Sequence, residues 1–490
     1  MAALMLQGTG SDVGKSVLVA GLCRALVNRG LSVRPFKPQN MSNNAAVTID
    51  GGEIGRAQAL QAIACRVPPH SDFNPVLLKP QADRTSQLIV HGKVRGTLGA
   101  ANFREARRPL LEEVMQSFRR LEQACDIVLV EGAGSPAEIN LRAGDIANMG
   151  FARAANVPVL LIGDIDRGGV IAAIVGTRTV IDPDDAAMIR GFIINKFRGD
   201  PALFEDGYRQ IEMLSGWNGH GVLPWVSAVA RLPSEDAVVL EKDVAVGEKK
   251  RILIACPIIP RIANFDDLDP LKAEAGVELV MVPPGRPLPV EAALIVLPGS
   301  KATIADLAAF RAEGWDIDLR AHVRRGGHVL GLCGGYQMLG RSIEDPDGIE
   351  GTAGCVEGLG LLDVETCLAR HKMLREVSGT ALGARLSGYE MHMGVTQRSA
   401  GVVPFVRFDD GGEDGAVDPT GRIIGSYVHG LLAEGGFRKA LLDRLGAASD
   451  GLDHGQRVDA ALDELAAAVE THLDVSAMIE LARAGGGRAA

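Results

Sequence analysis

The chain has 490 residues, 47% of them hydrophobic, and a formal net charge of −10 at pH 7. One hydrophobic core cannot serve a chain of this length, so we expect two or three domains. The negative charge, without a Lys/Arg cluster, argues against nucleic acid or an anionic membrane as a partner. We find no run of about 18 apolar residues and no secretion signal, which predicts a cytoplasmic protein.

Residues 5–16 combine a strand end, a glycine loop and a helix start, which predicts a phosphate-binding P-loop. Lys15 would reach the β- and γ-phosphates of ATP, and the Ser16 hydroxyl would hold Mg²⁺. The usual spacing wants glycine at position 9, where this chain has Thr9 between two glycines. An ordinary strand-to-helix turn is the alternative. The candidate ATP-binding residues of this loop are Thr9, Gly10, Ser11, Asp12, Val13, Gly14, Lys15 and Ser16.

Three polar side chains follow predicted strands at their carboxyl ends, where open α/β sheets bind ligands. Lys37 begins the polar stretch 37–44 and could hold a phosphate or a substrate carboxylate, or could simply be solvated. Glu131 ends a continuous apolar strand and is a candidate Mg²⁺ ligand, with a turn-capping carboxylate as the alternative. Asn195 follows another strand and offers both a donor and an acceptor to a purine edge.

Two separate stretches of the chain each show strands alternating with helices, which predicts two doubly wound α/β domains with largely parallel sheets. A charged segment without an apolar face separates the two patterns, and the C-terminal residues have helical apolar spacing. The predicted boundaries are an ATP-binding domain at 1–232, a linker at 233–250, a second α/β domain at 251–440 and a helical tail at 441–490.

The stretch 327–340 predicts a nucleophile elbow with sulfur in place of a serine oxygen. An apolar strand runs into Cys333 at a G-x-C-x-G turn, and a helix follows. Such a turn lifts the thiol clear of the sheet, and a helix N-terminus lowers the pKa of a thiol. The backbone N–H of Gly334, with one from Gly299 or Ser300, could form the oxyanion hole. A cysteine buried at a strand end is the alternative.

A cysteine nucleophile needs a general base, and four histidines follow the elbow in the chain. They are His371, His392, His429 and His454. His429 is favoured because it ends an apolar strand, where a rigid element can aim it. His392 is the competitor.

The combination of a phosphate-binding domain with a thiol-nucleophile domain resembles the glutamine-dependent amidotransferases. Segments 331–337 and 427–430 are similar to class I glutaminase domains, and segments 8–16 and 130–134 are similar to dethiobiotin synthetase. Most glutaminases of this class carry an acid two positions after the histidine, where this chain has Leu431; the cobyrinate subgroup, which works with a Cys-His pair alone, shares this departure. The segments that resemble the cobyric acid synthase family over nearly the full chain are 7–16, 35–44, 164–169, 195–199, 297–301 and 388–394.

This resemblance implies amidation of the b, d, e and g carboxylates of adenosylcobyrinic acid a,c-diamide, with L-glutamine as nitrogen donor and ATP with Mg²⁺ as cofactors. It implies catalysis by Cys333 and His429, and a substrate loop that includes Lys37, Asn40 and Asn44. The a,c-diamide synthases carry aspartates in that loop, so the two asparagines favour the later enzyme of the pathway.

Two other functions remain open from the sequence. One is a cobyrinic acid a,c-diamide synthase, which would consume a different corrinoid. The other is a partition-type ATPase switch, which would leave the cysteine elbow without a purpose and would hydrolyse ATP without regard to glutamine. The sequence does not indicate the oligomeric state.

Overall fold

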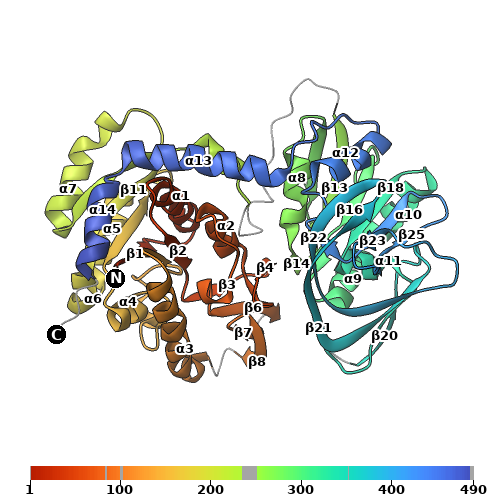
Figure 1. The fold of residues 1–490 in the computed structure, drawn as a ribbon, viewed down its shortest axis with the longest axis horizontal. Coiled ribbons are helices and arrows are strands. Elements are labelled where there is room, and N and C mark those ends of the chain that lie inside the picture. Colours follow the sequence, from red (N-terminus) through yellow and green to blue (C-terminus); the bar gives the residue numbers. More distant parts are fainter. Residues whose placement is uncertain (1, 83–84, 100–102, 234–250, 351–352, 486–490) are drawn as a thin grey trace. The chain divides into compact units, whose positions relative to one another are not determined.

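The computed structural model describes residues 2–82, 85–99, 103–233, 251–350 and 353–485. The chain forms two compact units (Figure 1), one of Met1–Pro233 with Val458–Ala490 and one of Ser234–Arg457. Nearly all of the predicted linker, residues 234–250, lies outside the described residues. The predicted helical tail, 441–490, is shared between the two units. Its larger part, Val458–Ala490, belongs to the first unit. None of the helices in the described ranges is long and apolar enough to cross a membrane.

The first unit is built on a six-stranded parallel sheet of order β12-β11-β10-β1-β9-β2. Helices cover both faces, so its central strands are buried apolar runs, as the sequence predicts. The strands are β1 (Ala2–Gly8), β2 (Val33–Phe36), β9 (Ile127–Glu131), β10 (Val159–Asp164), β11 (Ile189–Phe197) and β12 (Asn218–Pro224).

The C-terminal helices complete one face of this sheet. Leu465 and Val469 pack so closely on the first helix that a Cβ on Gly21 would lie 2.9 Å from Leu465. The helices of this face are α1 (Lys15–Asn28), α13 (His454–His472) and α14 (Val475–Gly485). On the other face lie α3 (Phe103–Ala124), α4 (Met149–Ala155), α5 (Val170–Val180), α6 (Pro183–Met188) and α7 (Glu205–Ser215).

A smaller substructure is inserted between β2 and β9. Its four-stranded sheet has the order β3-β6-β7-β8, and the two-stranded pair β4-β5 leads into α2. The stretch expected as a polar loop therefore contains a short strand, β3. The elements are β3 (Gln39–Met41), β4 (Ala45–Val47), β5 (Glu53–Gly55), α2 (Arg56–Ala64), β6 (Val76–Ala82), β7 (Thr85–Val90) and β8 (Lys93–Gly99).

The second unit has its own six-stranded sheet of order β15-β13-β16-β18-β26-β25, in which the edge strand β25 alone runs antiparallel. The prediction of two doubly wound α/β domains is confirmed. The strands are β13 (Ile252–Pro257), β15 (Val277–Val282), β16 (Leu294–Leu297), β18 (His328–Leu332), β25 (Ala416–Val417) and β26 (Ile423–Ser426). Among its helices are α8 (Asp269–Lys272), α9 (Thr303–Ala312), α10 (Trp315–Arg324), α11 (Gly334–Leu339) and α12 (Gly435–Arg444).

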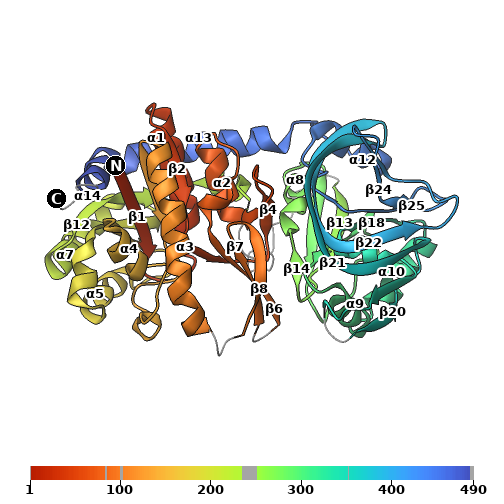
Figure 2. The same ribbon diagram turned by 60° about the horizontal axis from the view of Figure 1, so that its bottom comes forward.

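A second, mostly antiparallel sheet adds to this unit. Its centre is a long, curved hairpin of β21 (Val364–Ala381) and β22 (Ala384–Arg398), which Figure 2 shows from the side. The short strand β27 (Val428–His429) pairs with β22, which places Tyr389 opposite His429. The hairpin thus brings its own side chains to the strand that carries the predicted base.

Candidate functional site

The predicted P-loop links β1 to α1 in a conformation that fits an anion. Gly14 caps α1 with φ 92°, and Asp12 also has a positive φ of 59°. The Lys15 ammonium donates to the carbonyl oxygens of Gly10 at 2.8 Å and of Gly134 at 3.1 Å. The side chain therefore folds back under its own loop at the helix N-terminus, where the helix dipole favours a phosphate.

The Glu131 carboxylate lies at the centre of a buried polar cluster. It is 0% exposed and accepts hydrogen bonds from Ser16 Oγ at 2.8 Å, Lys37 Nζ at 2.9 Å and Gln61 Nε2 at 2.6 Å. A buried carboxylate is costly unless it is paired, and here a cation and neutral donors share that task. Glu131 does more than cap a turn, because it joins the P-loop, the residue that follows β2 and helix α2.

The donor set around Ser16 and Glu131 fits a magnesium ion. Mg²⁺ prefers a few oxygen ligands and keeps several of its waters. The cluster supplies a hydroxyl and a carboxylate, and Gln61 Oε1 nearby is buried without a hydrogen-bond partner in the described structure. An unused amide oxygen of this kind suits a metal-bound water.

The predicted substrate residues are buried in the same region. Lys37 is 5% exposed, so the solvated alternative for this lysine is wrong. Asn40 donates from Nδ2 to Gln58 Oε1 at 3.0 Å, and Asn44 accepts at its backbone oxygen from the first residue of α2, Arg56, at 3.2 Å. The structure therefore brings Lys37 and Asn40 to the Glu131 cluster, and it anchors Asn44 at the start of α2.

Asn195 lies against the P-loop. Its Nδ2 donates to the Val13 oxygen at 2.8 Å, and its Oδ1 accepts from the Lys196 backbone N–H at 2.9 Å. A Cβ on Gly14 would come within 2.4 Å of the same amide nitrogen. Lys196, which sequence reasoning missed, bonds Asp164 at 2.8 Å and also reaches the backbone oxygen of Asp12. These side chains brace the phosphate loop from β10 and β11.

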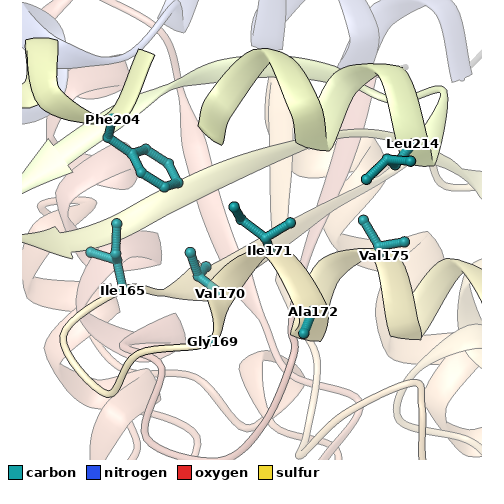
Figure 3. Close-up of a pocket in the computed structure, with 8 residues that line it drawn as sticks. All are labelled: Ile165, Gly169, Val170, Ile171, Ala172, Val175, Phe204 and Leu214. Atoms are coloured by element: carbon teal, nitrogen blue, oxygen red, sulfur yellow. The ribbon is translucent and has the colours of Figure 1, made fainter. Parts of the chain in front are cut away.

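An apolar cavity of about 540 Å³ lies in the same unit, beside α5 and α7. Figure 3 shows its lining side chains, which include Ile165, Val170, Ile171, Phe204 and Leu214. This lining offers no charged group for a phosphate or a carboxylate. The cavity is therefore not the phosphate site, whose residues are the polar ones described above.

The predicted elbow is present in the second unit. Cys333 lies between β18 and α11 with φ 49° and ψ −105°, a strained backbone that L-residues rarely adopt. Its N–H donates to the Ser426 oxygen at 2.8 Å, and the residue is 7% exposed. Position 335 has no room for a side chain, because a Cβ there would lie 2.1 Å from the backbone oxygen of Leu297.

We expect Gly335→Ala to destabilise the protein by about 1–3 kcal/mol, because a backbone oxygen cannot rotate away from the new methyl group. Gly436→Ala is the matched control. Gly436 also lies in a helix but has no atom within 4 Å of its hypothetical Cβ, so this change should be neutral or stabilising by less than about 1 kcal/mol. Urea unfolding of both variants measures the difference. Equal stabilities would contradict the packing argument for the elbow.

His429 is aligned by a carboxylate that the sequence pattern did not indicate. His429 Nδ1 lies 2.7 Å from Asp267 Oδ2, and the Gly430 N–H donates to Asp267 Oδ1 at 2.6 Å. Cys333 also interacts with the His429 ring, and both its charge and its hydrogen bond favour the protonated imidazole. Nδ1 is thus held by the acid, which leaves Nε2 for proton transfer with the thiol.

The electrostatics of this group favour a charged imidazole. Burial lowers the pKa of His429, but the charges of Asp267 and Cys333 outweigh burial and raise the pKa to about 10. A histidine with this pKa holds a proton readily once it has taken one from the thiol. The resemblance implied a Cys-His pair alone, and the structure adds an acid at His429, Asp267, which lies 162 residues before the histidine in the chain.

His392, the competing base, has a different environment. Its ring stacks on Tyr427 with centroids 3.7 Å apart, and its Nδ1 lies 2.8 Å from the Gly394 oxygen. An acid also lies near His392, because Glu390 Oε1 is 3.8 Å from its Nε2. The acid at His429 instead lies 2.7 Å from Nδ1, on the side of the ring where a general base needs it, and Cys333 interacts with the same ring. The geometry therefore favours His429.

The candidate oxyanion residues converge on the same place. A Cβ on Gly334 would lie 2.8 Å from the Ser300 backbone nitrogen, and a Cβ on Gly299 would lie 3.2 Å from His429 Cε1. Two short strands, β14 (Ile262–Ala263) and β17 (Gly299–Ser300), pair with each other and fix this segment. Gly299, Ser300 and Gly334 therefore lie close together beside His429.

Comparison with known proteins identifies a domain in each half of the chain. Residues 4–239 match the CobQ/CobB/MinD/ParA nucleotide binding domain, and residues 253–437 match the CobB/CobQ-like glutamine amidotransferase domain. The chain is 75% identical to a cobyric acid synthase of Rhizorhabdus wittichii, covering 99% of this chain and 100% of that protein. It is 74% identical to that of Novosphingobium aromaticivorans, covering 98% of each, and 59% identical to that of Brucella suis, covering 98% and 99%. With this identity over almost its whole length, the chain belongs to the cobyric acid synthase family.

Proposed function

We propose that the protein uses ATP and glutamine to amidate the b, d, e and g carboxylates of adenosylcobyrinic acid a,c-diamide, which yields adenosylcobyric acid. The observation that carries this proposal is the presence in one chain of an aligned Cys333, His429 and Asp267 and of a P-loop beside a buried lysine and carboxylate. The name of the relatives, cobyric acid synthase, supports a corrinoid substrate. A cytoplasmic location and the absence of a nucleic-acid partner stay predictions.

The second unit would release ammonia from glutamine. His429 takes the Cys333 proton, and the thiolate attacks the amide carbon of the side chain. The backbone N–H groups of Gly334 and Gly299 stabilise the oxyanion, and the imidazolium returns the proton to the departing ammonia. A thioester results, and water hydrolyses it to glutamate.

The first unit would activate the corrinoid carboxylate as an acyl phosphate, because a free carboxylate has no good leaving group. Backbone N–H groups of residues 9–16 and the Lys15 ammonium would bind the ATP phosphates. Mg²⁺ held by Ser16 and Glu131 would neutralise phosphate charge during transfer. Lys37, Asn40 and Asn44 would orient the carboxylate, and attack by ammonia would then release phosphate and form the amide.

The test is to incubate the purified protein with the a,c-diamide, Mg-ATP and glutamine, and to follow corrinoid mass and glutamate release. We expect successive amidations of the corrinoid and faster glutamate release when the corrinoid is present. Consumption of cobyrinic acid in place of its diamide would identify an a,c-diamide synthase instead. ATP hydrolysis without glutamate release or corrinoid modification would overturn the amidotransferase proposal.

A further inference from the structure

Two buried glutamines of α2 hold Glu131 in place. Gln58 and Gln61 are both 0% exposed, and their i, i+3 spacing puts them on one face of the helix. Gln61 Nε2 donates to Glu131 Oε2 at 2.6 Å and to the Ser16 backbone oxygen at 3.3 Å, and Gln58 Nε2 donates to Glu131 Oε2 at 3.4 Å. A buried amide destabilises the protein unless it is hydrogen-bonded, and the amide groups of both glutamines donate to the Glu131 carboxylate.

Gln58 differs from Gln61 in what its oxygen does. Gln58 Oε1 accepts from Asn40 Nδ2 at 3.0 Å, whereas Gln61 Oε1 has no partner in the described parts of the chain. The amide orientation of Gln58 follows from these neighbours, since its nitrogen must face the carboxylate and its oxygen must face the Asn40 donor. One side chain thus connects the stretch 37–44 with Glu131.

The contact between Gln58 and Asn40 is tightly enclosed. A Cβ on Gly55 would lie 2.2 Å from Asn40 Nδ2 and 2.9 Å from Gln58 Oε1. The Asn40 oxygen is also in use, because it accepts from the Met41 N–H at 2.8 Å. Asn40 therefore has little room to turn toward a ligand without changing its bond to Gln58.

We infer that Gln58 is a positioning residue that couples a corrinoid carboxylate at the stretch 37–44 to the geometry of Glu131, and so to the binding of Mg-ATP. This inference rests on the proposed function. A carboxylate that draws the Asn40 amide toward itself lengthens the bond from Asn40 Nδ2 to Gln58 Oε1 and loosens the Gln58 amide. Glu131 then loses one of its donors and becomes a better metal ligand. Since coupling is reciprocal, Mg-ATP binding also tightens the corrinoid.

The experiment measures the Kd of a non-hydrolysable ATP analogue with Mg²⁺ by calorimetry, with and without saturating a,c-diamide. For the wild-type protein we expect the diamide to lower this Kd by about 5–150-fold, the usual range of coupling between two sites. Gln58→Leu should bring the factor close to one. Gln61→Leu is the matched control, which should weaken nucleotide binding in both conditions but keep the factor, because Gln61 does not bond Asn40.

Asn40→Ala provides an independent arm that leaves the core of α2 intact. It should lose the same factor as Gln58→Leu, and the double variant should lose no more than either single variant. The inference is overturned if the diamide still lowers the analogue Kd in Gln58→Leu, or in Asn40→Ala if Gln58→Leu does not fold. It is also overturned if Gln61→Leu loses the effect of the diamide to the same extent as Gln58→Leu. If the wild-type protein does not convert the diamide at all, the proposed function fails instead.

Discussion

Cys333→Ala is expected to lower glutamine-dependent amidation by about 10⁴-fold or more, because a methyl group cannot form the thioester. Amidation with a high concentration of ammonium salt should continue, because the phosphate-binding residues belong to the other unit. The measurements are glutamate release and corrinoid amidation, each with glutamine and with ammonia as the nitrogen source.

Cys367→Ala is the control for the loss of a thiol. Cys367 is a free, exposed cysteine on β21 of the same unit, so its replacement should leave both nitrogen sources in use. Retained glutamate release in Cys333→Ala would show that the elbow is not the glutaminase site. Loss of the ammonia-dependent reaction in this variant would show that the two chemistries are not separable.

Asp267→Asn is expected to lower glutamine hydrolysis by about 10²–10⁴-fold, with ammonia-dependent amidation unchanged. The variant keeps the shape of the side chain but loses the charge that stabilises the His429 imidazolium. Its amide can also donate to Nδ1, which favours the tautomer that cannot accept the Cys333 proton. Steady-state glutamate release compared with the ammonia reaction measures this loss.

The pH dependence of the same variant has a defined sign. In the wild-type protein, burial lowers the pKa of His429 while Asp267 and Cys333 raise it, with a net result of about 10. Without the Asp267 charge the pKa falls, so the imidazolium that protonates the leaving ammonia is lost at lower pH. The basic limb of the glutamine pH–rate profile should therefore move to lower pH.

The free energy of unfolding should also depend on pH through the pKa of His429. The raised pKa of folded His429 contributes stability that is complete below its ordinary value of 6.5 and disappears as the pH rises through about 10. Asp267→Asn should lose part of this contribution, and urea unfolding across that pH range measures it. If Asp267→Asn hydrolysed glutamine at the wild-type rate, with the basic limb of its pH–rate profile at the wild-type pH, the proposed role of this carboxylate would be contradicted.

The sequence was most informative where function depends on local backbone geometry. Glycines at fixed offsets predicted the P-loop and the elbow, and both form, because the positive φ of Gly14 and the close approach of Gly335 to Leu297 leave few other residues possible there. Apolar runs likewise predicted the buried parallel strands, since a sheet covered on both faces needs apolar side chains on both sides. Family resemblance then connected these two local motifs.

Contacts between distant segments could not be predicted in this way. Asp267 meets His429 only because β14 and β17 bring the turn after Ile262–Ala263 to the elbow, and no spacing rule spans that separation. Gln58 reaches Glu131 through the placement of α2, although a glutamine in a helix is ordinarily a surface residue.

By itself, the sequence determined the two α/β patterns, the phosphate loop, the cysteine elbow and the family, because each depends on short-range spacing or on similarity along the chain. Tertiary structure alone decided which acid contacts His429, which side chains surround Glu131 and where the C-terminal helices pack. The physical reason is that a carboxylate or an amide acquires its role from the few groups within hydrogen-bond distance, and folding brings those groups together from remote parts of the chain.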